Sequence, residues 1–212
     1  MLTFHIVTLF PESLTSYIES SIIARAQSRK LIKVCFYNPR DFTKDRFARV
    51  DAKPYGGGPG MVLQAEPVIR AIAKAKGQKK DVQIIYLSPG GEQFDNKKAD
   101  NLSVKSRHIV LVCGRYEGID ERVRKVFPGK SLSVGPYVVT GGELPAMVIL
   151  DSVTRRLPGV LGSDVSIEER RVSSRSVFTR PAEIRYKGKV YKVPKVLRSG
   201  NHKDIDRWRE GN

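Results

Sequence analysis

The sequence predicts an α/β fold with a largely parallel β-sheet, followed by a smaller basic domain. Three observations lead to this prediction. Short β-branched runs alternate with segments long enough to hold helices. Glycine-bearing turns directly follow three of these runs. After Pro158-Gly159 the chain changes to a polar, charged stretch, which is typical of a linker between domains.

Five short runs are expected to form the strands of the sheet, because they are rich in β-branched and apolar residues. They are Thr3 to Leu9, Leu31 to Tyr37, Val82 to Leu87, His108 to Cys113 and Ser131 to Val134. The segments between them are long enough for crossover helices, and strands joined by crossovers run parallel.

Helices are expected where apolar residues recur near every third or fourth position. The segment from Glu12 to Arg29 shows this spacing most clearly, at Leu14, Tyr17, Ile18, Ile22, Ile23 and Ala26. Glu66 to Lys74 and Leu144 to Arg156 behave similarly. Each of these three segments is predicted to be one helix.

The second domain is expected to follow a linker. Ser163 to Ser176 is polar and has no clear period, so we divide the chain into residues 1–160, a linker over 161–176 and a small domain over 177–212. Within the small domain, Glu183 to Val193 alternates around Lys187-Gly188-Lys189 and predicts a hairpin. Asn201 to Arg209 predicts a short basic helix.

The charge of the chain points to a class of partner. Its 212 residues include 38 Lys and Arg against 22 Asp and Glu, a formal net charge of +16. Such an excess raises the local concentration of polyanions, so nucleic acid is the leading partner class. The alternatives are a merely basic protein and one that rests on an anionic membrane.

Other features of the composition disfavour several classes. Cys35 and Cys113 lie in apolar runs, where a thiol behaves as a small buried hydrophobe, so no disulfide framework is expected. The three histidines are far apart, which disfavours a structural zinc site. The start of the chain lacks signal-peptide features, and no apolar stretch reaches the roughly 18 residues of a membrane span. We therefore expect a cytoplasmic protein with no membrane partner.

Residues 55–61, Tyr-Gly-Gly-Gly-Pro-Gly-Met, form a glycine-rich loop that follows Arg46, Arg49 and Lys53. Glycines let a backbone approach a ligand closely, and cations neutralise phosphate. The Gly-Lys-Ser/Thr ending of a nucleotide P-loop is missing, and no Gly-x-Gly-x-x-Gly follows a strand. These absences remove the usual NTPase and dinucleotide interpretations, while an ordinary surface turn explains the loop equally well.

Three further loops are expected to share one pocket. They follow the runs that end near Leu87, Cys113 and Val134, and they contain Ser88-Pro89-Gly90, Gly114-Arg115-Tyr116-Glu117-Gly118 and Thr140-Gly141-Gly142. The carboxyl ends of parallel strands lie at one edge of a sheet, which is where α/β folds bind ligands. Taken singly, each loop is also explained by an ordinary strand-to-helix turn.

Four segments together resemble the signature segments of the bacterial tRNA (guanine-N1)-methyltransferases. They begin at Pro54, Cys113, Thr140 and Ser199 and read PYGGGPGM, CGRYEGIDER, TGGELPA and SGNH. The segments occur in the family's order and roughly its spacing, and they span nearly the whole chain.

The resemblance implies a fold, a cofactor and partners. The fold is α/β, with a SPOUT-type parallel sheet tied in a deep trefoil knot and a small, mainly helical C-terminal domain. The methyl donor is S-adenosylmethionine and the substrate is tRNA, at the guanine of position 37, which lies 3′ of the anticodon and follows another guanine. Family members are homodimers with each active site at the subunit interface. The family is also reported to use magnesium, although the sequence shows no dedicated ligand cluster.

The resemblance also implies the residues that bind the donor. They come from the three strand-end loops and their flanks: Tyr86, Leu87, Ser88, Pro89, Gly114, Tyr116, Glu117, Ser133, Val134, Gly135, Pro136, Tyr137, Val138, Val139, Gly141, Gly142 and Pro145.

Methylation of guanine N1 requires a general base, because this nitrogen carries a proton at neutral pH. An arginine near O6 would stabilise the charge that develops there. In the family the arginine ends the helix after the knot, which implies Arg155 here; a solvated helix end beside Arg156 is the alternative. The base is an aspartate in the interdomain linker, and the resemblance implies Glu169 at that place, with Asp164 as the competing candidate.

Several departures from the family pattern leave other functions open. Arg170-Arg171 replace the usual Ser-Phe in the linker, and Asp51-Ala52 replaces the usual pair of aspartates. The chain also stops soon after Trp208-Arg209, where relatives carry a further tail. The alternatives are a catalytically impaired RNA-binding relative and a knotted methyltransferase that acts on another RNA position.

Overall fold

The computed structural model describes residues 1–162 and 176–211. The chain divides into two compact units, Met1–Leu161 and Gly162–Asn212, and each is considered by itself. Asp164 and Glu169, the two candidates for the general base, lie outside the described residues.

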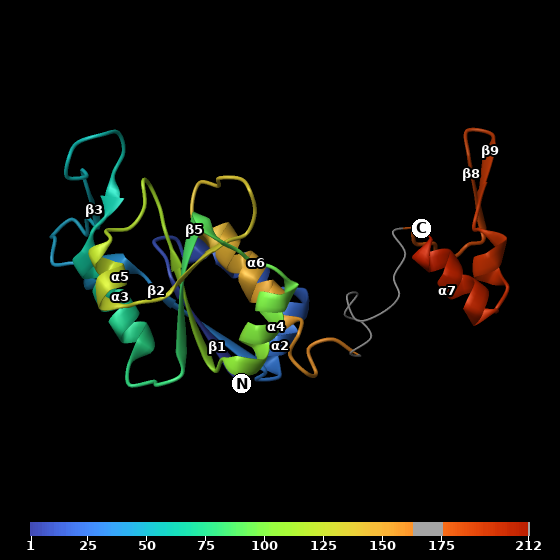
Figure 1. The fold of residues 1–212 in the computed structure, drawn as a ribbon, viewed down its shortest axis with the longest axis horizontal. Helices are drawn as coiled ribbons and strands as arrows, with labels where there is room; N and C mark the ends of the chain where they lie inside the picture. The colour runs from blue at the N-terminus through green and yellow to red at the C-terminus, as the bar shows by residue number, and fades with distance from the viewer. Residues whose placement is uncertain (163–175, 212) are drawn as a thin grey trace. The chain divides into compact units, whose positions relative to one another are not determined.

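The first unit is built on a five-stranded sheet in the order β2-β1-β6-β5-β7 (Figure 1). The strands are β1 (Leu2–Val7), β2 (Ile32–Tyr37), β5 (Val82–Gln93), β6 (His108–Cys113) and β7 (Lys130–Ser133). Every neighbouring pair is parallel, as the sequence predicted. All five carboxyl ends therefore lie at one edge of the sheet.

Helices cover both faces of this sheet (Figure 1). On one face, α1 (Glu12–Ile18), α2 (Ser21–Ser28), α4 (Asn96–Lys105) and α6 (Glu143–Thr154) share a core with Phe4, Ile6 and Leu111. On the other face, α3 (Ala65–Lys76) and α5 (Arg122–Val126) pack on Val7, Val110 and Val112. Alternate residues of the central strands thus serve two separate cores.

Some predicted elements differ from the observed ones. The single helix expected over residues 12–29 is wrong, because Ser20 is extended and Ser21 has a φ of 50°, which separates α1 from α2. Helices α4 and α5 were not predicted, and each buries a single residue, Ala99 or Val123, so their apolar period is weak. Strand β5 runs beyond Leu87 because residues 88–91 loop out, after which Glu92 pairs with Leu132.

A short antiparallel hairpin, β3–β4, comes between β2 and α3 in the sequence. The short η1 helix (Pro39–Phe42) follows β2, and β3 (Asp51–Ala52) then pairs antiparallel with β4 (Val62–Leu63). The glycine-rich loop connects β3 to β4.

The second unit contains a hairpin and a helix. Strand β8 (Glu183–Tyr186) pairs antiparallel with β9 (Lys189–Lys192) across Lys187-Gly188, and both turn residues have positive φ. The η4 helix (Lys195–Arg198) and α7 (His202–Glu210) follow. None of residues 176–211 is buried, and the clearest side-chain packing is that of Phe178 on Trp208, with ring centroids 6.1 Å apart.

Candidate functional site

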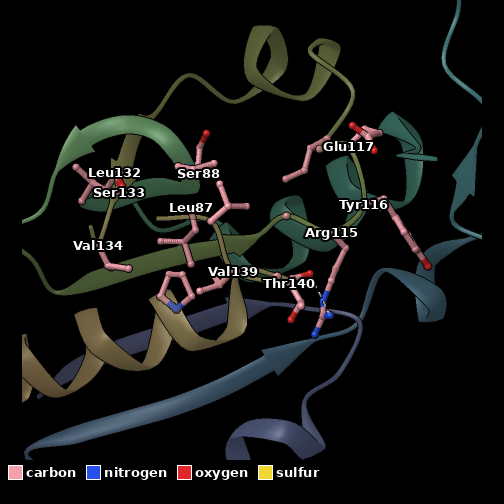
Figure 2. Close-up of a pocket in the computed structure, with 18 of the residues that line it drawn as sticks. Leu87, Ser88, Arg115, Tyr116, Glu117, Leu132, Ser133, Val134, Val139 and Thr140 are labelled. Atoms are coloured by element: carbon pink, nitrogen blue, oxygen red, sulfur yellow. Dashed lines mark hydrogen bonds between the residues drawn. The ribbon is translucent and has the colours of Figure 1, made fainter. Parts of the chain in front are cut away.

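A pocket of about 260 Å³ lies at the carboxyl edge of the sheet (Figure 2). Its walls are the segment of β5 that loops out after Leu87, the loops that follow β6 and β7, and the start of α6. In Figure 2, Leu132, Ser133 and Val134 lie at one end of the pocket, and Arg115 and Tyr116 at the other. The three strand-end loops therefore share one pocket.

Most of the residues expected to bind the donor line this pocket: Leu87, Ser88, Pro89, Gly114, Tyr116, Glu117, Ser133, Val134, Tyr137, Val138, Val139, Gly141, Gly142 and Pro145. The lining also contains residues that were not predicted to bind the donor: Arg115, Gly118, Ile119, Arg124, Leu132 and Thr140. Arg115, Gly118 and Thr140 belong to loops that the sequence predicted to form the pocket, and Ile119 follows one of them. Position alone could therefore have indicated these four, but not Arg124 or Leu132.

Three expected residues, Tyr86, Gly135 and Pro136, do not line the pocket. Tyr86 is fully buried, and its hydroxyl donates to the carbonyl of Phe127 at 2.7 Å. Burial raises the pKa of Tyr86 to about 12. Gly135 lies behind the ring of Tyr137, where an added Cβ would meet Cζ at 2.6 Å. The guanidinium carbon of Arg124, which lines the pocket, lies 4.4 Å from the centroid of the Tyr86 ring, so Tyr86 contacts the wall from behind.

The loop after β6 is fixed by the β3–β4 hairpin. Glu117 N donates to Met61 O, Leu63 N to Gly118 O and Asp120 N to Leu63 O, each at 3.0 Å. Gly60 approaches Glu117 so closely that an added Cβ would lie 2.7 Å from Cγ. The absence of a side chain at Gly60, the last glycine of the glycine-rich loop, therefore leaves room for the Glu117 side chain.

The tip of the glycine-rich loop has a different environment. Gly56, Gly57 and Gly58 all have positive φ, and nothing lies within 4 Å of where their Cβ atoms would be. Tyr55 beside them is fully exposed. This tip is an open surface turn in the first unit, while the base of the loop supports the pocket.

Backbone contacts join the three pocket loops to one another. Gly142 N donates to Gly114 O at 2.9 Å, and Phe94 N donates to Ser133 O at 2.7 Å. A Cβ on Gly142 would lie 2.6 Å from Cα of Cys113. Only glycine permits this approach, which explains Gly142 directly before α6.

A buried ionic network lies beside the pocket. Glu143 is 5% exposed; its Oε1 accepts from the Thr8 hydroxyl at 2.7 Å, and its Oε2 lies 2.9 Å from Nη2 of Arg115. Arg115 also donates to Thr140 O at 3.3 Å (Figure 2). Its guanidinium carbon lies 4.5 Å from the centroid of the Phe10 ring. Burial, and then the Glu143 carboxylate, raise the pKa of the nearby Cys113 thiol. The network joins β1, the β6 loop and α6 around the pocket.

Arg155 caps the carboxyl end of α6, where its N–H donates to Asp151 O at 3.0 Å. The structure does not place Arg155 among the pocket residues. Its neighbour Arg156 is buried. Nε of Arg156 lies 3.0 Å from Oδ1 of Asp100, and its Nη2 donates to Oδ1 of Asn96 at 2.7 Å. Arg156 therefore anchors α6 to α4, while the role of Arg155 stays a prediction.

The remaining sequence expectations concern thiols, metals and membranes. Cys113 is buried, whereas Cys35 is partly exposed because β2 is an edge strand. Within residues 1–162 and 176–211, no three His, Cys, Asp or Glu side chains are grouped so that they could hold a metal ion. No helix in these same ranges has the length and hydrophobicity needed to span a membrane.

Comparisons with known proteins give a consistent result. The family model described as tRNA (Guanine-1)-methyltransferase TrmD matches residues 2–212. The tRNA (guanine-N(1)-)-methyltransferase of Dictyoglomus turgidum is 46% identical over 213 residues, covering 99% of this chain and 84% of the relative. That of Carboxydothermus hydrogenoformans is 47% identical over 209 residues, covering 97% and 80%.

A solved structure agrees with these relatives. The crystal structure of tRNA (m1G37) methyltransferase from Aquifex aeolicus superposes with a TM-score of 0.81 at 36% identity, covering 100% of this chain and 88% of that one. These matches confirm the resemblance inferred from the four sequence segments.

Proposed function

The chain belongs to the tRNA (guanine-N1)-methyltransferase family, and we propose that it transfers a methyl group from S-adenosylmethionine to N1 of the guanine at position 37 of tRNA, 3′ of the anticodon. The observation that carries this proposal is the pocket that three glycine-bearing loops form at the carboxyl edge of the sheet. The description of the Aquifex aeolicus structure as a tRNA (m1G37) methyltransferase supports the position.

The residues of the pocket fit the methyl donor. Leu87, Leu132 and Val134 would offer apolar surface to the donor, and the Glu117 carboxylate would favour its sulfonium cation. Gly142 keeps the wall at this place free of a side chain. When bound, S-adenosylmethionine supplies an electrophilic methyl group; binding and orienting the donor is the task of this lining.

The chain's own residues would handle the proton and the developing charge. A carboxylate of the linker, Glu169 or Asp164, would remove the proton from guanine N1. The Arg155 guanidinium would donate hydrogen bonds to O6, where negative charge accumulates as the proton leaves.

We propose that a homodimer completes each site. Pro145 lines the pocket near the start of the 12-residue helix α6. Arg155 follows the other end, ten residues after Pro145 and so about 15 Å away at 1.5 Å per residue, which places it far from this part of the pocket within one chain. Exposed apolar side chains on α1 and α6 support a subunit contact there: Tyr17 at 44%, Val148 at 45% and Leu144 at 66%.

We also propose that the path of the chain through the pocket loops is the family's trefoil knot. The bonds from Phe94 to Ser133 and from Gly142 to Gly114 support this path, because they hold the segments after β5, β6 and β7 against one another. Knots are rare exceptions among folds, and the periodicity of a sequence does not reveal them.

The second unit is proposed to grip the phosphates of the anticodon stem-loop. Its cations are Arg180, Lys187, Lys189, Lys192, Lys195, Arg198, Lys203, Arg207 and Arg209. Binding through these residues would weaken as salt rises. An RNA loop can splay out a base, so the anticodon loop can deliver its guanine to a pocket.

Methyl transfer tests the proposal directly. Purified protein is incubated with labelled S-adenosylmethionine and a tRNA transcript, and the methylated nucleotide is mapped. We expect one label at N1 of guanine 37. If the protein binds the donor in calorimetry but leaves the RNA unlabelled in the transfer assay, it is the catalytically impaired RNA-binding relative. A label at another nucleotide would mean a methyltransferase that acts on another RNA position. Chelation with EDTA followed by re-addition of Mg²⁺ tests the metal requirement.

Variants assign the catalytic roles. Arg155→Ala should lower turnover by about a hundredfold or more while donor affinity is unchanged, since its contact forms with the RNA base. Wild-type turnover in this variant would remove Arg155 from the mechanism. Glu169→Gln and Asp164→Asn are compared in the same assay, and the base is the residue whose substitution slows transfer; if neither does, another group removes the proton.

A further inference from the structure

A loop over residues 43–49 displays an aromatic ring that two guanidinium groups contact. Phe47 is 64% exposed. The guanidinium carbon of Arg46 lies 4.5 Å from the centroid of the Phe47 ring, and that of Arg49 lies 5.4 Å from it. The Phe47 ring is therefore displayed at the surface together with two cations that contact it.

Hydrogen bonds fix this loop in place. Asp45 Oδ1 accepts from the N–H groups of Phe47 and Arg49, and its Oδ2 accepts from the Arg49 guanidinium at 2.8 Å. The Thr43 hydroxyl donates to Arg49 O at 3.1 Å, and Ala48 adopts a φ of 52°. The Arg49 guanidinium lowers the pKa of Asp45 to about 2, so the carboxylate stays charged at neutral pH.

The loop also has a definite place relative to the pocket. It follows η1 after the carboxyl end of β2 and leads directly into β3, so it lies at the same edge of the sheet as the pocket loops. Figure 1 shows this blue segment beside β3. Arg49 is paired with Asp45, whereas Arg46 has no acidic partner among the described residues.

We infer that residues 43–49 bind single-stranded RNA next to the target guanine, with a base stacked on the Phe47–arginine group and a phosphate near Arg46. Unpaired RNA bases stack on aromatic rings and on guanidinium planes, and both are displayed here in a fixed arrangement. Binding a base there would cost little conformational entropy of the loop, because the loop is already held by its own hydrogen bonds. The inference rests on the proposed function.

The first test removes the ring. Phe47→Ala should raise KM for the tRNA transcript, and its Kd in filter binding, by roughly tenfold, while kcat and donor affinity are unchanged, because the loop lies outside the pocket. Phe47→Trp should keep near wild-type KM, since tryptophan also stacks. Val104→Ala is the matched control: Val104 is 82% exposed on α4, so this variant also removes an exposed apolar side chain.

The second test removes a charge. Arg46→Ala should make the dependence of log Kd on log salt shallower by roughly one unit, as expected for one lost phosphate contact. Arg107→Ala removes the same charge at the opposite edge of the sheet, before β6, and should leave the slope unchanged. Phe47→Ala should also retain the wild-type slope, which separates stacking from charge.

The outcomes distinguish the inference from the function on which it rests. If wild-type protein methylates tRNA but Phe47→Ala and Arg46→Ala keep its KM and salt slope, the inference is overturned and the function stands. The inference is also overturned if Phe47→Ala changes the oligomeric state of the protein in gel filtration, or if Phe47→Trp is as impaired as Phe47→Ala. Either result would mean that the loop serves a protein contact. No methyl transfer by the wild-type protein would overturn both.

Discussion

The two units of the chain bury their side chains to very different degrees. In the first unit, both faces of the sheet carry fully buried residues, such as Phe4 and Leu111 on one face and Val110 on the other. In the second, none of residues 176–211 is buried, and Ile184 and Tyr186 are 55% and 62% exposed. The first unit can therefore hold its pocket rigid through its own core, whereas residues 176–211 of the second unit have a surface but little core. Its rigidity must come mainly from local hydrogen bonds and from what it binds.

Truncation of an apolar side chain gives the largest expected contrast between the units. Leu111→Ala removes a fully buried side chain from the central strand β6 and should lower the free energy of unfolding by about 2 to 5 kcal/mol. Val190→Ala in the hairpin removes one that is 43% exposed and should cost under about 1 kcal/mol. Urea unfolding followed by circular dichroism measures both. Equal losses would mean that the second unit has a core of its own.

Ion pairs should show the same contrast with a smaller effect. Arg115→Ala leaves the buried Glu143 carboxylate without its cation, which should cost roughly 3 kcal/mol. Arg209→Ala removes an exposed partner of Asp206 in the second unit and should cost under about 1 kcal/mol. Thermal unfolding of the two variants gives the comparison. If Arg115→Ala were as stable as Arg209→Ala, solvent would already screen the Glu143 pair.

The sequence predicted the strands of the first unit well because a parallel sheet leaves a strong local signal. His108 to Cys113 is buried on both faces, so its run of apolar residues is continuous and its bounds match the prediction. Weakly amphipathic helices were missed for the opposite reason: α4 buries Ala99 alone. The break between α1 and α2 depends on the backbone of Ser20 and Ser21, which apolar periodicity does not encode.

For the candidate site, strand-end loops were predictable and long-range partners were not. The rule that ligands lie at the carboxyl ends of parallel strands selected three loops that do line one pocket. The bond between Thr8 and Glu143 joins residues 135 positions apart, and no local pattern indicates it. The roles of Arg155, Glu169 and Asp164 came from the family resemblance and stay predictions.

A buried histidine should make the stability of the first unit depend on pH. His5 is 2% exposed and hydrogen-bonds Tyr37 at 3.1 Å and His108 at 3.3 Å. Burial, and then the Lys79 charge, lower the pKa of His5 from 6.5 to about 4. Between these values the unfolded chain binds the proton more readily, so stability falls as pH drops from about 6.5 towards 4, by on the order of 2 kcal/mol.

The control for this effect lies in the second unit. Urea unfolding is measured at several pH values in this window. His5→Gln should remove most of the pH slope, whereas His202→Gln, at an exposed position of α7, should retain it. A wild-type slope in His5→Gln would assign the pH dependence to other groups.

The smallest expected effect concerns the surface of the second unit, where a single cation is one of many. Lys187 lies at the tip of the β8–β9 hairpin with its ammonium 5.5 Å from the Tyr186 ring. If this hairpin contacts tRNA phosphates, Lys187→Ala should weaken tRNA binding only about two- to fivefold and make its salt dependence shallower by roughly one unit. Lys105→Ala removes the same charge from the end of α4 in the first unit, and filter binding should show no change. Because the second unit has no buried residue among those described, Lys187→Ala should also leave the free energy of unfolding unaltered, so a loss of affinity in this variant reports on the RNA contact alone.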